Sequence, residues 1–174
     1  MTCGPAGPQL VDRIDADALA RLWTAVTRVG GAVGFVEDTP GAEIRAAAQL
    51  AAAEVAAGRE QLLVLGPPAA PVGTVFLRRG AGPRTEHGAE VVRLMVRPDQ
   101  QGRGHGTALL DAAVAHATTL GREFLMLTAR GGTDLPRYYA ARGWTPVGVW
   151  PGTLRLGPGP DGLRDAHWFH LRLR

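Results

Sequence analysis

The first third of the chain has the spacing of apolar residues that is typical of amphipathic helices. Apolar side chains recur at positions i, i+3, i+4 and i+7 in one segment, at Leu19, Leu22, Trp23 and Val26. This periodicity predicts a helix that Asp15 can cap and that Gly30 ends. A second helix is predicted from Pro40 to Gly58, because proline suits a first helical position and glycine follows many helix ends. Its apolar face is expected to contain Ile44, Ala47, Ala48, Ala51 and Val55.

Short apolar runs separated by glycine and proline are typical of strands, and they occupy much of the remaining chain. Strands are predicted at Gln9–Ile14, Gln61–Leu65, Val72–Leu77, Ala89–Val96, Phe124–Leu127, Trp144–Trp150 and Ala166–Leu173. Between the later strands, helices are predicted at Gly106–Thr119 and Thr133–Arg142. A long loop is expected over Pro151–Asp165, before the last strand.

The order of these elements predicts the fold class. Two helices precede a meander of strands, and strands and helices then alternate, as in right-handed β-α-β crossovers. We therefore predict a mixed α/β (α+β) fold, with a mixed, mostly antiparallel central sheet and helices on both faces. Residues 1–8 are rich in glycine and proline and are expected to form a mobile tail, so residues 9–174 would form a single domain.

Composition and charge exclude several classes of function. The net charge is +3 and no lysine occurs, but the arginines are scattered, whereas nucleic-acid binding needs a clustered basic face. No apolar run is long enough to span a membrane, and the N-terminus does not resemble a signal peptide. Cys3 is the only cysteine, and no Cys/His spacing of the zinc type occurs, so neither a disulfide nor a metal site is predicted. A cytoplasmic location is expected.

A glycine-rich turn between a predicted strand and a predicted helix is the strongest chemical signal in the chain. It reads Gln101-Gly102-Arg103-Gly104-His105-Gly106 and leads into a helix at Thr107. The first N–H groups of a helix have no intrahelical partners and, with the helix dipole, form an anion site. The dinucleotide-binding pattern would need glycine at position 107, and a Walker loop would need lysine.

The turn instead resembles the pyrophosphate-binding loop of the GNAT N-acetyltransferase superfamily, in its Gln-x-x-Gly-x-Gly spacing and in the Val-x-Pro that precedes it at Val96. The resemblance implies the GNAT fold and acetyl-CoA as co-substrate, with no metal. The residues that it implies for cofactor binding are Leu94, Met95, Val96, Gln101, Gly102, Arg103, Gly104, His105, Gly106, Thr107 and Tyr139.

Acetyl transfer to an amine needs a group that takes the amine proton, and Glu90 is the predicted base. Strand alternation places Glu90, Val92, Leu94 and Val96 on one face, although a bulge near Val96, which is usual in the superfamily, would change this register. Apolar neighbours would desolvate the carboxyl and raise its pKa. The alternatives are a solvated carboxylate or an ion pair with Arg93. His87, in the preceding loop, could also relay protons.

The resemblance also implies an oxyanion donor and an acid. The donor would be a main-chain N–H of the strand, that of Val96 or Met95. The segment from Leu135 to Trp144 resembles the Phe-Tyr-x-x-x-Gly-Phe segment of the superfamily, in which the tyrosine lies beside the CoA sulfur. This implies Tyr139 as the acid that protonates the thiolate, with Tyr138 as a weaker candidate. Both tyrosines could instead be packing residues.

Several segments are similar to the tabtoxin-resistance acetyltransferases, which acetylate an amino-acid toxin. They are Gly30–Phe35, Glu90–Val96 and the Pro151-Gly152 region with Pro160-Asp161-Gly162. The likeness implies an acceptor pocket between the loops Gly30–Asp38 and Thr153–Asp165, with contacts from Phe35, Glu37, Asp38, Glu90 and Thr128. Thr128 and Thr153 depart from the residues that are usual in that group.

Together these features predict an acetyl-CoA-dependent N-acetyltransferase for a small amine, such as an amino-acid-like toxin or antibiotic, acting by direct attack in a ternary complex. Glu37 and Asp38 could attract the ammonium group, and Arg155 or Arg164 could meet a substrate carboxylate. The alternatives are acetylation of protein N-termini or lysines, and a non-catalytic acyl-CoA-binding module. A small-molecule acceptor is the expected partner, without nucleic acid or membrane, in a monomer or homodimer.

Overall fold

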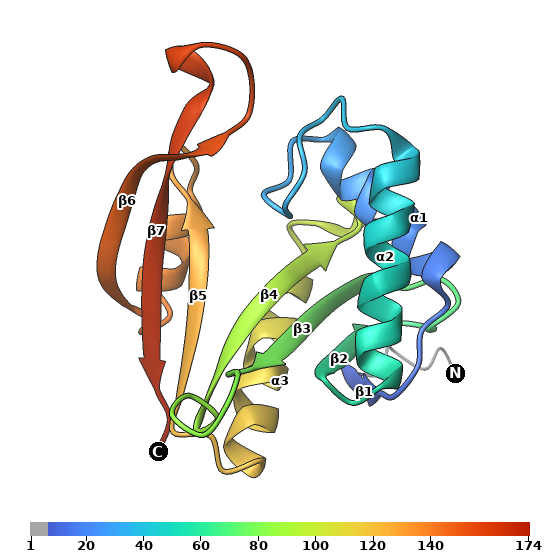
Figure 1. Ribbon diagram of the computed structural model, residues 1–174. Helices are drawn as coiled ribbons and strands as arrows, with labels where there is room; N and C mark the ends of the chain where they lie inside the picture. The colour runs from blue at the N-terminus through green and yellow to red at the C-terminus, as the bar shows by residue number, and fades with distance from the viewer. Residues whose placement is uncertain (1–6) are drawn as a thin grey trace.

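A mixed sheet of seven strands, in the order β1-β2-β3-β4-β5-β7-β6, forms the centre of the computed structural model, which describes residues 7–174 (Figure 1). Only β4 and β5 pair in parallel, and the other neighbours are antiparallel. The strands are β1 (Gln9–Val11), β2 (Glu60–Leu65), β3 (Gly73–Arg79), β4 (Gly88–Val96), β5 (Phe124–Arg130), β6 (Thr145–Arg155) and β7 (Leu163–Arg172). The predicted mixed, mostly antiparallel sheet is confirmed.

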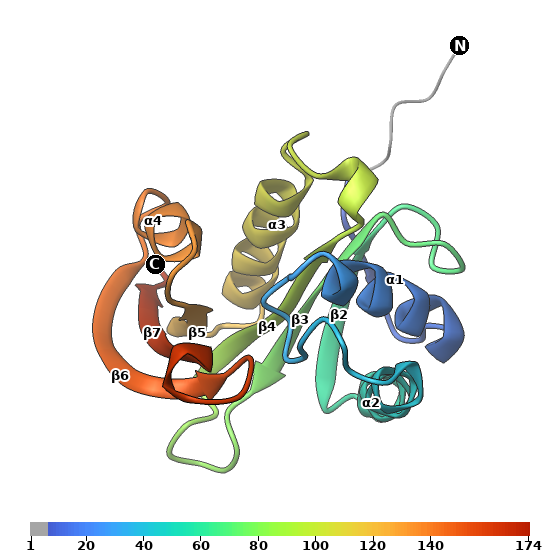
Figure 2. The ribbon, with the colours of Figure 1, turned by 90° about the horizontal axis from the view of Figure 1, so that it is seen from above.

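Helices cover both faces of this sheet, as predicted (Figure 2). They are α1 (Ala16–Arg28), α2 (Gly41–Ala56), α3 (His105–Thr119) and α4 (Leu135–Ala140), with short 3-10 turns η1 (Pro98–Gln100) and η2 (Pro160–Gly162). The core under α1 and α2 contains Leu62, Phe76 and Met95, whereas the core under α3 contains Leu109 and Leu125. No helix within residues 7–174 is both long and apolar enough to cross a membrane.

Helix α1 forms where its apolar periodicity predicts it. The Asp15 side chain accepts a hydrogen bond from the Asp17 N–H at 2.9 Å and so caps the helix. Leu19 and Trp23 are buried against the sheet. The Trp23 indole N–H donates to the Val33 carbonyl at 2.8 Å, which fixes the loop after α1 to the helix.

A β-bulge in β4 separates side chains that strand alternation would place together. Between Met95 and Val92 the pairing with β3 shifts, and Arg93 has a φ of 52°, an uncommon conformation for a residue with a side chain. As a result Val92 packs on the α1 and α2 side, whereas Leu94 and Val96 pack on the α3 side. The prediction that Glu90, Val92, Leu94 and Val96 share one face is therefore wrong.

Strands β4 and β5 are paired at one end only. Gly88–Glu90 of β4 pairs with Phe124–Met126 of β5, and the pairing ends there although both strands continue. Figure 1 shows the two strands diverging beyond this point. The divergence leaves main-chain groups of β4 without a partner strand and opens a space between the two halves of the sheet.

The predicted long loop over Pro151–Asp165 is wrong, because both neighbouring strands extend into it. Strand β6 runs to Arg155 and β7 begins at Leu163, with a register shift that sets the residues after Trp150 opposite Asp165. At this bulge Gly152 has a φ of 61° and its N–H donates to Asp165 Oδ1 at 2.8 Å. The Asp165 carboxylate thus links β7 to β6 where the main-chain hydrogen bonds between the two strands are interrupted.

Other boundaries differ by a few residues. Strand β1 ends at Val11, earlier than predicted, and β5 continues to Arg130 because it pairs with β7 over its whole length. Helix α4 is shorter than the predicted segment, and Pro40 precedes α2 rather than beginning it. Of the predicted N-terminal tail, residues 1–6, which include Cys3, lie outside the described residues.

Candidate functional site

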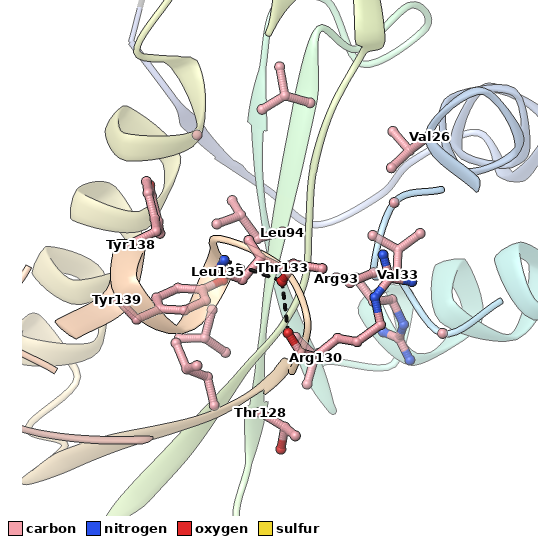
Figure 3. A pocket seen from close by; sticks show the side chains of 18 of the residues that line it. Val26, Val33, Arg93, Leu94, Thr128, Arg130, Thr133, Leu135, Tyr138 and Tyr139 are labelled. Atoms are coloured by element: carbon pink, nitrogen blue, oxygen red, sulfur yellow. Dashed lines mark hydrogen bonds between the residues drawn. The ribbon is translucent and has the colours of Figure 1, made fainter. Parts of the chain in front are cut away.

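A cleft of about 970 Å³ lies where β4 and β5 diverge. One wall consists of β4 and the glycine loop, and the other of β5 and α4. The loop after α1 closes one end. Figure 3 shows side chains of β4, β5 and α4 directed into this space, among them Leu94, Thr128 and Tyr139.

The glycine loop has the geometry of an anion site. Gly102 and Gly104 have φ values of 74° and 81°, which residues with side chains rarely adopt. A Cβ at Gly104 would meet no protein atom within 4 Å, so the space in front of the loop is open. Helix α3 begins at His105, and its first N–H groups face this space without intrahelical partners. These features fit a phosphate group.

Most of the residues implied for cofactor binding line the cleft. They are Leu94, Val96, Gln101, Gly102, Gly104, His105, Gly106, Thr107 and Tyr139. Two residues do not line it. The Met95 side chain is fully buried in the core under α1 and α2, and Arg103 points to solvent on the outside of the loop.

The N–H of Val96, and not that of Met95, faces the cleft. The Arg97 N–H donates to the Val72 carbonyl at 2.8 Å, and Met95 is paired with Thr74 of β3. Successive N–H groups of a strand point to opposite sides, so the Val96 N–H points away from β3. That side faces the cleft, because β5 has diverged there. The carbonyl of Val96 points the same way and accepts a hydrogen bond from Gln101 Nε2 at 3.0 Å.

A polar cluster on α4 lies next to the glycine loop, and the sequence did not predict it. The Tyr138 hydroxyl is 3.2 Å from Thr107 Oγ1, to which the Arg142 guanidinium donates at 3.0 Å. The guanidinium also stacks 3.6 Å from the centroid of the Tyr138 ring. The i, i+4 spacing of Tyr138 in α4 and Arg142 in the turn after it was the available signal. The cluster adds positive charge beside the open N-terminus of α3.

Tyr139 lies deeper in the cleft wall than Tyr138. Its ring packs in tilted or edge-on contacts with Tyr138, Trp144 and Phe169, and its side chain still lines the cleft (Figure 3). Burial, with a smaller contribution from Tyr138 and against the opposing charge of Arg142, raises the pKa of Tyr139 to about 12. The phenol therefore stays protonated at neutral pH. Tyr139 thus packs in the cleft wall while its side chain lines the cleft.

Glu90 belongs to an ion-pair network on the α1 and α2 side of the sheet. Its carboxylate is 3.6 Å from the Arg78 guanidinium, which also binds the buried Glu60 at 2.8 Å. The Arg93 guanidinium binds Glu60 at 2.5 Å and lies over the rings of Trp23 and Phe76. Glu90 is therefore paired with Arg78 and not with Arg93. Its side chain keeps 28% of its exposure and faces the cleft.

The loop after α1 forms the acceptor end of the cleft over Gly30–Phe35. Phe35 lines the cleft and packs on Trp23, with ring centroids 5.3 Å apart. Glu37 and Asp38 are exposed and do not line it. The Glu37 carbonyl accepts a hydrogen bond from Arg28, which anchors the loop to α1. Two of the predicted substrate-binding residues are thus placed outside the cleft.

On the opposite wall, the chain from Thr153 to Asp165 contributes no lining residue, so the predicted second border loop is absent from the cleft. Arg164 hydrogen-bonds to main-chain carbonyls of its own hairpin, and so does Arg155. In their place β5 contributes Thr128 and Arg130, of which the sequence predicted only Thr128.

Neither a metal cluster nor a histidine at the acceptor end is visible in the part of the chain that the structure describes. Residues 7–174 contain no group of three His, Cys, Asp or Glu side chains that could hold a metal ion. His87 is exposed, packs against Phe124 and does not line the cleft. Glu90 is therefore the titratable acid or base of β4 that faces the acceptor end.

Comparisons with known proteins agree with this arrangement. The acetyltransferase (GNAT) family model matches residues 34–144, more than half of the chain. Among solved structures, the GNAT-family acetyltransferase from Streptococcus pneumoniae is similar to this chain, with a TM-score of 0.74 and 15% sequence identity. The match covers 95% of this chain and 99% of the Streptococcus pneumoniae chain. Ribosomal-protein-alanine N-acetyltransferase from Brucella melitensis has a TM-score of 0.73 at 15% identity, with coverages of 95% and 99%.

A third structure contains the cofactor. Phosphinothricin acetyltransferase from Sinorhizobium meliloti, in complex with acetyl-CoA, has a TM-score of 0.72 at 18% identity, covering 97% of this chain and 89% of its own. At these identities the likeness concerns the fold. The family match, the shared fold and the glycine loop together show that the chain belongs to the acetyltransferase (GNAT) family and is an acyltransferase.

Proposed function

We propose that this chain transfers the acetyl group of acetyl-CoA to the amine of a small, amino-acid-like acceptor, such as a toxin or antibiotic, by direct attack in a ternary complex. The observation that supports this most is the position of the Val96 N–H. It faces a cleft that has the glycine loop on one side and Glu90 with the Gly30–Phe35 loop on the other. The two substrates would therefore meet beside Val96.

In this proposal the chain uses three groups in sequence. Glu90 takes a proton from the acceptor amine, directly or through water, which makes the amine nucleophilic. The Val96 N–H donates to the carbonyl oxygen as negative charge develops there, an interaction that contributes roughly 3–4 kcal/mol when well placed. When the amine nitrogen has bonded to the thioester carbon and the C–S bond breaks, Tyr139, which is protonated at neutral pH, gives its phenolic proton to the departing thiolate and is then reprotonated from solvent.

The acceptor end of the cleft favours a small molecule over a protein segment. The Gly30–Phe35 loop is held by the Trp23 indole and by Arg28, so it forms a fixed wall. An extended peptide would need an open groove through this wall. Acetylation of protein N-termini or lysines is the second candidate, and a displaced loop would be its structural requirement.

A library of small amines, with thiol release as the signal, tests the proposal. Turnover of a small amine, with formation of its N-acetyl product confirmed by mass spectrometry, would support it. A short-peptide library and isolated proteins should be assayed in parallel. Thiol release with peptides or proteins alone would replace the small-amine proposal with protein acetylation.

A further inference from the structure

The acceptor end of the cleft contains more positive than negative charge. Arg78, Arg93 and Arg130 line this region, whereas Glu90 is the carboxylate there. Arg78 is within ion-pair distance of both Glu60 and Glu90, and Arg93 binds Glu60. These two arginines and two glutamates neutralise one another. Arg130 is the remaining charge.

Arg130 has no acidic partner among residues 7–174. No carboxylate in that range lies within 4.0 Å of its guanidinium, which donates one hydrogen bond, to the Gly30 carbonyl at 2.6 Å. Arginine has five N–H donors, arranged in a planar fork that matches a carboxylate. The side chain is half-buried and runs from β5 toward Val33, along the acceptor end (Figure 3).

Arg130 lies in the part of β5 that has separated from β4. Glu90 is paired with Met126, and Arg130 follows four residues later on the same face of β5. At about 3.3 Å per residue this is about 13 Å along β5 from the level of Glu90. Leu94 and Val96 line the opposite wall of the same cleft. A group held by Arg130 would therefore lie in the cleft that the Val96 N–H faces.

We propose that Arg130 is a specificity-determining residue that binds a carboxylate, or a similarly compact oxyanion, on the acceptor. This inference rests on the proposed function, which places the acceptor at this end of the cleft. An amino acid would then bind with its carboxylate on Arg130 and its amine directed along the cleft, toward the thioester. The arginines of the β6–β7 hairpin, Arg155 and Arg164, are excluded from this role by their position.

A binding experiment with matched probes tests the subsite. The probes are 4-methylpentanoate and 4-methylpentanamide, together with L-leucine and L-leucinamide, titrated by calorimetry into protein saturated with CoA. Within each pair only the carboxylate is replaced by an amide. Binding is compared because amidation also changes the basicity of the leucine amine, which would alter turnover. Arg130→Gln removes the charge, and Arg155→Gln serves as the matched control.

The wild-type protein should bind the carboxylate of each pair about 10- to 100-fold more tightly than the amide, as expected for a charge-assisted bidentate contact. Arg130→Gln should lose this preference and keep its affinity for CoA. Arg155→Gln should retain both. The matched amides also control for a purely structural role, because loss of the Gly30 contact alone would weaken both members of a pair equally.

Two results would overturn the inference: a wild-type protein that does not prefer the carboxylates, or an Arg130→Gln protein that keeps the preference. Different results would contradict the proposed function. If the carboxylate preference depends on Arg130 but no small amine gives thiol release, the subsite stands and the small-amine reaction is wrong. If small amines are acetylated without a carboxylate preference, the reaction stands and the subsite is wrong.

Discussion

The side-chain amide of Gln101 donates to the main-chain carbonyl of Val96 at 3.0 Å, which ties the glycine loop to the end of β4. The N–H of the same Val96 residue faces the cleft. One side chain thus fixes the distance between the loop that fits a phosphate and the donor that would contact the thioester oxygen. Under the proposed function, this contact would couple cofactor binding to the reaction centre.

Replacing Gly104 with valine should weaken acetyl-CoA binding at least tenfold. Gly104 has a φ of 81°, and an added side chain would project into the open space where the anion is expected. Calorimetry with acetyl-CoA measures the effect. Gly82→Val is the matched control, because Gly82 has a φ of 89° and equally open surroundings but lies outside the cleft. Equal affinities in the two folded variants would contradict the assignment of the loop.

Tyr139→Phe should lower kcat roughly 10²-fold, within the usual range for general acid catalysis, while leaving the affinity for acetyl-CoA unchanged. The ring remains, so its contacts with Trp144 and Phe169 are kept. Tyr138→Phe is the comparison, because it removes a hydroxyl that contacts Thr107 of the cofactor loop. It should affect acetyl-CoA binding more than kcat. The reverse pattern in rapid-quench kinetics would make Tyr138 the acid.

Glu90→Gln should lower kcat and preserve acetyl-CoA affinity, because Glu90 faces the acceptor end and not the glycine loop. The acidic limb of the pH–rate profile should disappear or move in the variant. Glu86→Gln, at an exposed position outside the cleft, controls for the loss of one negative charge. If Glu90→Gln keeps both the rate and the profile on the best small amine, Glu90 is not the base.

The buried phenol of Tyr139 should make the protein less stable in alkali. Its pKa is raised from 10.0 to about 12, so the folded state holds the proton more tightly than the unfolded state. The stability that this group contributes is complete below pH 10 and is lost as pH rises toward 12. The loss amounts to at most about 3 kcal/mol.

Urea unfolding at pH 8, 10 and 11 measures this effect. Wild-type protein should lose more stability above pH 10 than Tyr139→Phe, because the variant has no proton to release at this position. The other titrating groups are common to both proteins and cancel in the difference. Parallel pH dependences of the two unfolding free energies would show that the Tyr139 phenol ionises in the folded state as readily as in the unfolded state.

The parts of the fold that depend on local patterns were predictable. The apolar spacing around Leu19 and Trp23 requires one buried helix face, and Asp15 supplies the cap at the expected place. The glycine loop also follows from local sequence, because Gly102 and Gly104 adopt the positive φ values for which glycine is needed. Each of these features is determined within a few residues of chain.

Features that depend on distant pairing were predictable only in part, because the resemblance implied a bulge near Val96 but the residues alone did not locate it between Val92 and Met95. The bulge at Arg93 places a non-glycine residue in the left-handed region, where its side chain is held by Glu60 and by the rings of Trp23 and Phe76. No single segment contains this information. The extension of β6 and β7 was missed for a similar reason. Glycine and proline suggested a loop, but Asp165 supports the pairing across the hairpin.

The side chains of the second cleft wall show the same limit. Arg130 and Arg142 carry no motif, and they reach the cleft only because β5 and α4 form its second wall. Glu37 and Asp38 had a suitable charge and a suitable loop, yet the loop turns them outward. Whether a charged residue reaches the cleft thus depends on the orientation of the strand or loop that carries it. A position close to the predicted pocket in the sequence is weaker evidence.

The divergence of β4 from β5 has an evolutionary consequence. The opening is made by the course of the backbone, and the groups that fit the cofactor there are largely main-chain N–H groups, which substitutions leave in place. The acceptor wall, in contrast, is built from side chains such as Thr128 and Arg130. Mutations on that wall can exchange one acceptor for another without rebuilding the acyl-donor site. Under the proposed function, the architecture would therefore allow the substrate range to change while the reaction type is retained.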